Sequence, residues 1–280
     1  MPEGHTLHRL AGALDTCFRG RPVAVSSPQG RFADSARLLD GSRVEGAEAW
    51  GKHLFVAFEG ERFVHVHLGL IGHFDVYGGP AAPPVGAVRL RLASAPPDPS
   101  YADLRGATTC ELVTAGGRAG VLDRLGPDPL RDDADWTRAW ARISRSRVAI
   151  GALLMDQSVL AGVGNVYRAE LLFRHRIHPL RPGNTLRRGR FEQMWTDLAG
   201  LMHDGLTTGR IDTVRAEHTP EAMGRPPRVD DHGGEVYVYR RAGQPCHVCG
   251  AKVRTELLGG RNLFWCPRCQ KRFRSRSSSS

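Results

Sequence analysis

The first residues of the chain, Pro2 and Glu3, could carry covalent chemistry. A small second residue permits removal of the initiator Met, which would leave Pro2 with a free secondary amine. An α-amino group titrates near about pH 8 and a lysine side chain near about 10.4, so this amine is the better nucleophile at neutral pH. It could attack an aldehyde carbon to form an iminium ion, with Glu3 moving a proton beside it.

A carboxylate next to this amine raises the pKa of the amine, so the chemistry needs burial or a nearby cation. Lys52, in Gly51-Lys52-His53-Leu54-Phe55, is a candidate for that cation because it is the only lysine in residues 1–140. A plainer interpretation makes Pro2 and Glu3 an ordinary start of a helix, where both residue types are favourable. On this segment alone the plainer interpretation is preferred.

Four cysteines have the spacing of a metal site. They form two C-x-x-C pairs separated by 16 residues, and they are Cys246, Cys249, Cys266 and Cys269. This spacing predicts a four-thiolate ribbon around one structural zinc ion. Two disulfides are disfavoured in a cytosolic protein, and the hairpin-like stretch between the pairs suits an iron–sulfur cluster poorly. The other two cysteines, Cys17 and Cys110, are expected to be buried thiols without chemistry.

A glycine-rich turn in residues 159–168 could bind an anion. Gly162 and Gly164 let the backbone approach a ligand closely, and Asn165 is expected to cap the helix that follows. Backbone amides exposed at that helix start would bind a phosphate. A glycine-lined turn between packed helices is the equal alternative, although the basic surroundings favour the phosphate.

The composition indicates a nucleic-acid or other polyanion partner. The chain has 280 residues, enough for about two domains, and a net charge of +10 with 41% hydrophobic residues. Residues 1–140 carry a net charge of −2 and residues 141–280 carry +12, so the second half is the polyanion-binding half. The chain lacks an apolar run long enough to span a membrane and a signal peptide, so we expect a cytoplasmic protein.

The apolar pattern divides the chain into different kinds of structure. Helical spacing predicts a helix over residues 5–18. Short alternating runs separated by Gly- and Pro-rich turns then predict an antiparallel sandwich or barrel; they are 22–25, 44–50, 54–58, 62–68, 88–92 and 109–113. Helices are expected over 136–143, 150–157, 165–173 and 186–206. A short strand is expected at 237–239.

Five motifs together resemble the formamidopyrimidine-DNA glycosylase and endonuclease VIII family of base-excision repair enzymes. They occur in the family's order from residue 2 to about 272, and they are Met1-Pro2-Glu3-Gly4, Gly51-Lys52-His53-Leu54, His67-Leu68-Gly69-Leu70, residues 157–168 and residues 260–271. The resemblance implies a multidomain α+β fold. Its parts would be a catalytic β-sandwich domain with an N-terminal helix (2–115), a linker (116–135), a helix-two-turn-helix domain (136–235) with a mobile loop (216–235), the zinc ribbon (236–272) and a disordered tail (273–280).

The resemblance also implies roles for individual residues. Pro2 would form a Schiff base with C1′ of the damaged nucleotide, and Glu3 would be the general acid for base loss. Lys52 would donate a proton in β-elimination and Arg261 in δ-elimination. Backbone phosphates would be held by Asn165, next to Gly164, and by His67.

An apolar wedge is expected to fill the space left by the extruded base. Leu70 and Ile71 stand where the family places this wedge, and the alternative is a pair of sandwich-core residues. His65 and His67 alternate on a strand, but single strand histidines are more often structural, so we predict no metal there.

Departures from the family pattern favour one branch. His5 replaces the proline usual after Pro-Glu-Gly, which leaves the chemistry intact. The 8-oxoguanine branch carries an Arg-x-Phe-Gly element, and residues 102–107 lack its Phe. The sequence therefore predicts an endonuclease VIII-like bifunctional glycosylase and AP lyase for oxidised pyrimidines.

Two rival functions stay open. One is an enzyme of the same family acting on 8-oxoguanine or formamidopyrimidine, and the other is a zinc-ribbon nucleic-acid binder without activity. For the favoured function we expect damaged double-stranded DNA as partner and zinc as the one cofactor. We further expect a monomer with no membrane association and no obligate protein partner.

Overall fold

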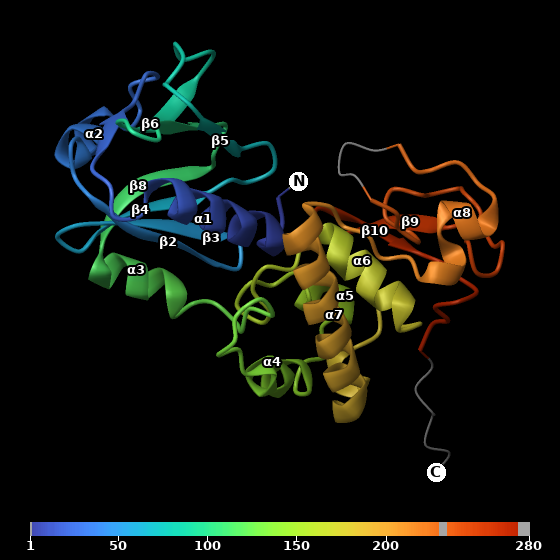
Figure 1. The fold of residues 1–280 in the computed structure, drawn as a ribbon. Coiled ribbons are helices and arrows are strands. Elements are labelled where there is room, and N and C mark those ends of the chain that lie inside the picture. Colours follow the sequence, from blue (N-terminus) through green and yellow to red (C-terminus); the bar gives the residue numbers. More distant parts are fainter. Residues whose placement is uncertain (1, 230–233, 274–280) are drawn as a thin grey trace. The chain divides into compact units, whose positions relative to one another are not determined.

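The structure is a computed structural model that describes residues 2–229 and 234–273. The chain divides into two compact units, residues 1–125 and residues 126–280 (Figure 1). Among the residues described, no helix is both long and apolar enough to cross a membrane.

The first unit is an antiparallel sandwich of two four-stranded sheets that share one core. One sheet has the order β2-β3-β4-β8 and consists of Val44–Trp50, His53–Phe58, Arg62–His67 and Thr109–Thr114. The other has the order β1-β6-β7-β5 and consists of Val23–Ser26, Val88–Ser94, Ser100–Arg105 and His73–Gly78. The sandwich predicted from the apolar alternation is confirmed.

Three helices belong to this unit, and they are α1 (Gly4–Phe18), α2 (Ala33–Leu39) and α3 (Ala115–Leu122). The predicted first helix is confirmed, because Leu7, Leu14 and Phe18 are buried in the sandwich core. Asp15 accepts a hydrogen bond from the backbone N–H of Ala47 in β2, 3.0 Å away. The last turns of α1 therefore lie beside β2.

Two strands and two helices of this unit are absent from the sequence-based prediction. In β7, Ala102 and Leu104 point into the core, and the buried Asp103 between them lies on the other face, where Arg91 pairs with it at 2.6 Å. With only two core-facing residues, the apolar alternation of this strand is too short to reveal it. α3 occupies the start of the segment expected to be a linker, and its N-cap residue Thr114 accepts a hydrogen bond from Gly117 N–H.

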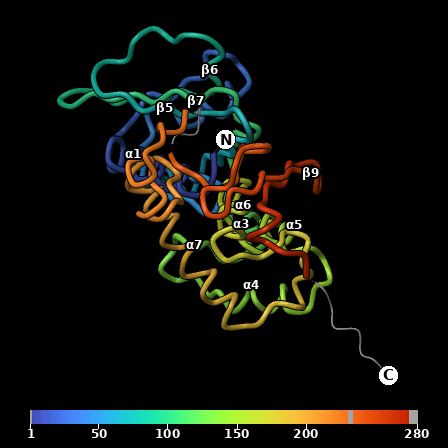
Figure 2. Tube along the Cα trace, turned by 90° about the vertical axis from the view of Figure 1, so that its right-hand side faces the viewer, coloured from blue at the N-terminus to red at the C-terminus, as the bar shows by residue number. Residues whose placement is uncertain are grey.

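The second unit combines helices with a two-stranded antiparallel sheet. The helices are α4 (Trp136–Ile143), α5 (Ile150–Leu153), α6 (Asn165–Arg174), α7 (Arg188–Thr208) and α8 (Pro220–Met223), with 3₁₀ turns at Gly183–Thr185 and Ala216–His218. The sheet consists of β9 (Arg254–Leu258) and β10 (Arg261–Trp265). Figure 2 shows the long helix α7 beside α4 and α6, and all three contribute to one apolar core.

Three expectations for this unit need correction. α5 ends at Leu153 rather than at 157, because the Asp156 carboxylate accepts hydrogen bonds from the N–H and hydroxyl of Ser158 and starts a separate turn. Residues 237–239 are not a strand, since their N–H groups donate to the Glu170 carboxylate instead of to a neighbouring strand. The loop expected over 216–235 contains a 3₁₀ turn and α8, while residues 230–233 and the expected tail from 274 lie outside the described residues.

Candidate functional site

Pro2 and Glu3 stand immediately before α1. Glu3 is the N-cap residue of this helix, and it forms a reciprocal capping interaction with Thr6, whose Oγ1 lies 3.4 Å from Glu3 N. The Glu3 side chain is fully buried, whereas Pro2 is half-buried. Glu3 therefore caps α1, as the plainer interpretation expects. Complete burial of its carboxylate nevertheless costs free energy that a residue serving only to start a helix would not need to incur.

Lys52 lies at the tip of the β2–β3 hairpin. Trp50 and His53 pair across this hairpin, so Gly51 and Lys52 form a two-residue turn. Gly51 has φ +58°, as the first central position of a type II′ turn requires, and a glycine adopts this conformation without strain. The turn therefore projects Lys52 beyond the end of the sheet.

The direction of α1 places its first residues toward the same hairpin. Arg19, just after α1, pairs with Val44 at the start of β2, and Asp15 bonds to Ala47 further along. α1 therefore runs antiparallel to β2, so the start of α1 lies toward the end of β2. Pro2, Glu3 and Lys52 consequently gather toward one end of the unit, as the proposed chemistry requires.

The predicted wedge residues are exposed. Leu70 is 51% and Ile71 is 82% exposed, so the alternative that they belong to the sandwich core is wrong. They occupy the turn between β4 and β5, which packs against the turn after β7. A Cβ atom at Gly72 would lie 2.9 Å from Ala107 Cα, so only glycine permits this packing.

His67 ends β4 close to this turn and is half-buried. Its ring centroid lies 5.1 Å from that of His53. Burial lowers the pKa of His67, and the neighbouring Lys52 and His65 lower it further. His65 itself is buried and hydrogen-bonded to Glu111 and His53, which makes it a structural histidine as expected.

The glycine turn before α6 differs in detail from the expectation. Gly164 is the N-cap residue and Asn165 is the first residue inside the helix, so Asn165 is not the cap. The Asn165 side-chain oxygen accepts a hydrogen bond from Arg168 one turn later. Because glycine has no side chain, Gly164 offers no side-chain cap to the start of α6.

Arg168 connects this turn with the zinc ribbon. Its guanidinium is buried and donates to the carbonyl oxygen of Asn262 in β10 at 3.0 Å, next to Arg261. It also donates to the carbonyl of Gly151 in α5 at 3.3 Å. Sequence reasoning missed this residue, although an arginine inside a largely apolar helix was a possible signal.

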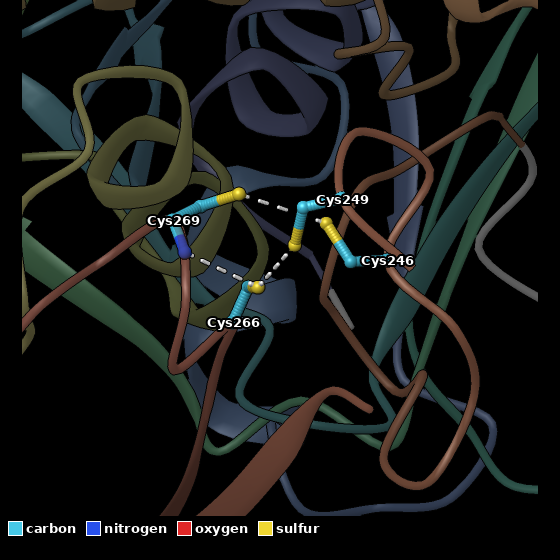
Figure 3. A group of neighbouring side chains, drawn as sticks. All are labelled: Cys246, Cys249, Cys266 and Cys269. Carbon is cyan, nitrogen blue, oxygen red and sulfur yellow. Dashed lines mark hydrogen bonds between the residues drawn. The ribbon is translucent and has the colours of Figure 1, made fainter. Parts of the chain in front are cut away.

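The four predicted cysteines form one cluster (Figure 3). Their sulfur atoms all lie within 4.8 Å of one another, with 3.9 Å between Cys246 and Cys269 and 3.4 Å between Cys249 and Cys266. Zn–S bonds of about 2.3 Å in a tetrahedron imply S···S distances of about 3.8 Å. The cluster therefore fits one structural zinc ion, and no other such group occurs among the residues described.

The ribbon presents Arg261 directly after a tight turn. Leu258 pairs with Arg261, and the two residues between them, Gly259 and Gly260, have φ values of +57° and +71°. Two positive φ values in a two-residue hairpin define a type I′ turn. Arg261 is half-buried at the start of β10.

Two buried polar residues that sequence reasoning missed hold the ribbon to the helices of this unit. The Gln270 amide accepts from Cys266 N–H and donates to the carbonyl of Ile177, both at 2.9 Å. The fully buried Glu170 carboxylate accepts from the N–H groups of residues 237–239 and from the Thr213 hydroxyl. Neither residue follows a spacing pattern that a sequence could reveal.

Family models match three parts of the chain. The formamidopyrimidine-DNA glycosylase N-terminal domain matches residues 1–110, and the H2TH domain of the same glycosylase matches residues 125–216. The zinc finger found in FPG and IleRS matches residues 243–272. These matches cover the sandwich, the helical part and the cysteine cluster.

Full-length relatives agree with the models. A Mycobacterium tuberculosis protein named Endonuclease 8 1 is 55% identical over 96% of this chain and 100% of its own. A formamidopyrimidine-DNA glycosylase of Thermomicrobium roseum is 32% identical over 96% of this chain and 98% of its own. The Fpg protein of Lactococcus lactis, solved in complex with abasic-site DNA, shares the fold with a TM-score of 0.76 and 22% identity over 96% of this chain and 100% of its own. The chain belongs to the formamidopyrimidine-DNA glycosylase and endonuclease VIII family.

Proposed function

We propose that this chain, a base-excision DNA glycosylase with AP lyase activity, removes oxidised pyrimidines from double-stranded DNA through a Schiff base on Pro2. The observation that carries this proposal is the arrangement at one end of the sandwich. A fully buried Glu3 adjoins Pro2, and the β2–β3 hairpin projects Lys52 at the same end. An amine, a buried acid and a second cation are the groups that the combined reaction needs.

The steps follow from the chemistry of these groups. Glu3 protonates the sugar as the damaged base leaves, and the Pro2 amine bonds to C1′ to give an iminium ion. The iminium acidifies the neighbouring C2′–H bond, so the 3′ phosphate can leave by β-elimination with Lys52 as proton donor. Arg261 then assists loss of the 5′ phosphate by δ-elimination. A water nucleophile could not cut the strand in this way, because it forms no iminium.

DNA would be held by groups from both units. His67 and the N–H groups around Gly164 and Asn165 are proposed phosphate contacts, since helix starts attract anions. Leu70 and Ile71 are the proposed wedge, and their exposure supports that role. The enzyme is proposed to act as a monomer on chromosomal DNA in the cytoplasm.

The choice of lesion rests on the turn after β7. Ala107 in this turn packs against the wedge turn at Gly72 and offers no ring to probe the opposite base. Ring-saturated pyrimidines stack and pair poorly, so they cost least to extrude. The 55% identity to a protein named Endonuclease 8 1 supports the same branch, whereas the more distant glycosylase relatives favour the rival one.

Single-turnover excision on matched duplexes tests the proposal. We expect thymine glycol or dihydrouracil to be removed faster than 8-oxoguanine paired with cytosine, with little dependence on the opposite base. Faster removal of 8-oxoguanine would assign the chain to the other branch. Binding without any base release would leave only a zinc-ribbon DNA binder.

A further inference from the structure

One face of the β2-β3-β4-β8 sheet packs against the sandwich core, and the opposite face carries polar side chains. Leu54, Val64 and Val66 point into the sandwich core. The side chains that alternate with them therefore lie on the opposite face; by strand register these are His53, Phe55, His65, His67 and Glu111. Three histidines and a carboxylate thus occupy neighbouring positions on three strands, beginning next to Lys52.

Three of these side chains form a continuous hydrogen-bonded row. Glu111 Oε1 lies 2.9 Å from His65 Nδ1, and His65 Nε2 lies 2.9 Å from His53 Nδ1. The His65 ring stacks on Phe55 with 4.8 Å between centroids. The His65 and His53 centroids are 5.1 Å apart with 23° between the ring planes, so the hydrogen bond joins these two rings edge to edge. The His65 side chain is 6% exposed and that of Glu111 is 55% exposed, so the row runs from solvent to the hairpin end of the sheet.

The carboxylate at one end sets the direction of the row. An ionised carboxylate only accepts hydrogen bonds, so His65 must donate from Nδ1. A neutral His65 then has an unprotonated Nε2, which accepts from His53 Nδ1–H. The one remaining ring nitrogen, Nε2 of His53, consequently carries a lone pair and no proton.

The surroundings keep His53 uncharged. Burial lowers the pKa of His53 to about 3, and the nearby His65, His67, Arg124 and Lys52 add to this effect. From the elements packed on this face, the charged groups are Glu48 of β2, Glu111 of β8 and Arg118 of α3, which pairs with Glu48. His53 directly follows Lys52 in the chain, so this neutral ring lies beside the turn that carries Lys52.

We propose that Glu111 and His65 orient His53, which acts as a positioning residue for Lys52. Their hydrogen bonds leave a neutral acceptor nitrogen of His53, and not an N–H donor, next to the hairpin that carries the Lys52 ammonium group. This inference rests on the proposed function of Lys52. A lone pair at this place can accept a hydrogen bond from the ammonium, whereas a donor N–H or an imidazolium would repel it. The row thereby helps to hold the Lys52 ammonium in place for β-elimination.

Nitrogen-15 NMR of the histidines in the full-length zinc-loaded protein tests the direction of the row. We expect two rings at pH 7 with the proton on Nδ1, assigned by their loss in His53→Gln and His65→Gln. In Glu111→Ala the carboxylate no longer fixes the row, so His53 should become protonated on Nε2. A wild-type His53 with a proton on Nε2, or a doubly protonated His65, would overturn the proposal.

Strand cutting at a preformed abasic site tests the consequence. Glu111→Ala should cut roughly tenfold to a hundredfold more slowly, the scale expected for a misplaced catalytic group. The alkaline limb of its pH–rate profile should move to lower pH. Glu111→Asp should restore part of the rate and part of the profile. The matched control is Glu59→Ala, which removes an exposed carboxylate in the turn at the far end of β3. Borohydride trapping should be kept in both variants, because the Pro2 amine is untouched.

The outcomes separate this inference from the proposed function. A wild-type protein that neither traps nor cuts the abasic duplex would remove the proposed function itself. A wild-type protein that traps and cuts, together with a folded Glu111→Ala variant whose rate and pH profile equal those of Glu59→Ala, would overturn the positioning role alone.

Discussion

Two β-hairpins present basic side chains in this protein, and they are anchored in different ways. Lys52 extends from a four-stranded sheet that belongs to a sandwich core, with Leu54 and Val66 buried just behind it. Arg261 extends from a two-stranded sheet beside the four-cysteine cluster. Two strands alone are at best marginally stable in water. The first hairpin therefore depends on apolar burial in a large core, whereas the second, which buries Phe264 and Trp265, also has a metal site beside it.

Removing zinc should have the largest effect, because it should unfold one hairpin and leave the other folded. Structural zinc contributes folding free energy of about 10 kcal/mol or more, so the ribbon should unfold in a chelator. Hydrogen exchange of residues 236–272 should become fast, whereas that of residues 1–125 should stay slow. Duplex binding should be lost with it. Normal DNA binding by the zinc-free protein would show that the ribbon has no part in recognition.

Glu3→Gln should separate base excision from strand cutting, the two steps proposed at the end of the sandwich that carries Lys52. A positioned proton donor contributes about 10²–10⁴ in rate, so base excision should fall by about that factor. Cutting at preformed abasic sites should persist, since Pro2 can still attack a free aldehyde. Both activities would be assayed on duplexes of one sequence. Their joint loss in a folded variant would contradict the division of labour.

Arg261→Ala should change products more than rates. The variant should accumulate the β-elimination product at the expense of the β,δ product, since its side chain is proposed to assist only the last step. Gel separation of the two 3′ ends measures the ratio. Lys252→Ala, at another basic residue of the ribbon, is the matched control. An unchanged product ratio in Arg261→Ala would remove Arg261 from the chemistry.

Acid should weaken the sandwich through two histidines, the buried His5 and the half-buried His53. Burial lowers the pKa of His5 to about 4 and that of His53 to about 3. As the pH falls below about 6.5, the unfolded chain takes up protons that the folded rings do not, so stability falls toward pH 4. Hydrogen exchange of β3 and β4 should report this loss, and His53→Gln should reduce it. A flat response between pH 7 and pH 4.5 would contradict the assignment.

The sequence predicts features that depend on spacing and misses those that depend on contacts across the fold. The cysteine pairs, α1 and most strands follow from short-range patterns and are confirmed. The ion pair that buries Asp103 of β7 escapes prediction because its partner, Arg91, lies on another strand. The row from Glu111 to His53 escapes for the same reason, since strand register brings its members together.

The chemical identity of the nucleophile is the most direct test of the mechanism. Borohydride should trap the protein on an abasic duplex, and mass spectrometry of the tryptic fragment should place the adduct on a Pro2 amine freed of Met1. An adduct mapped to Lys52, or no adduct at all, would contradict the proposed Schiff base.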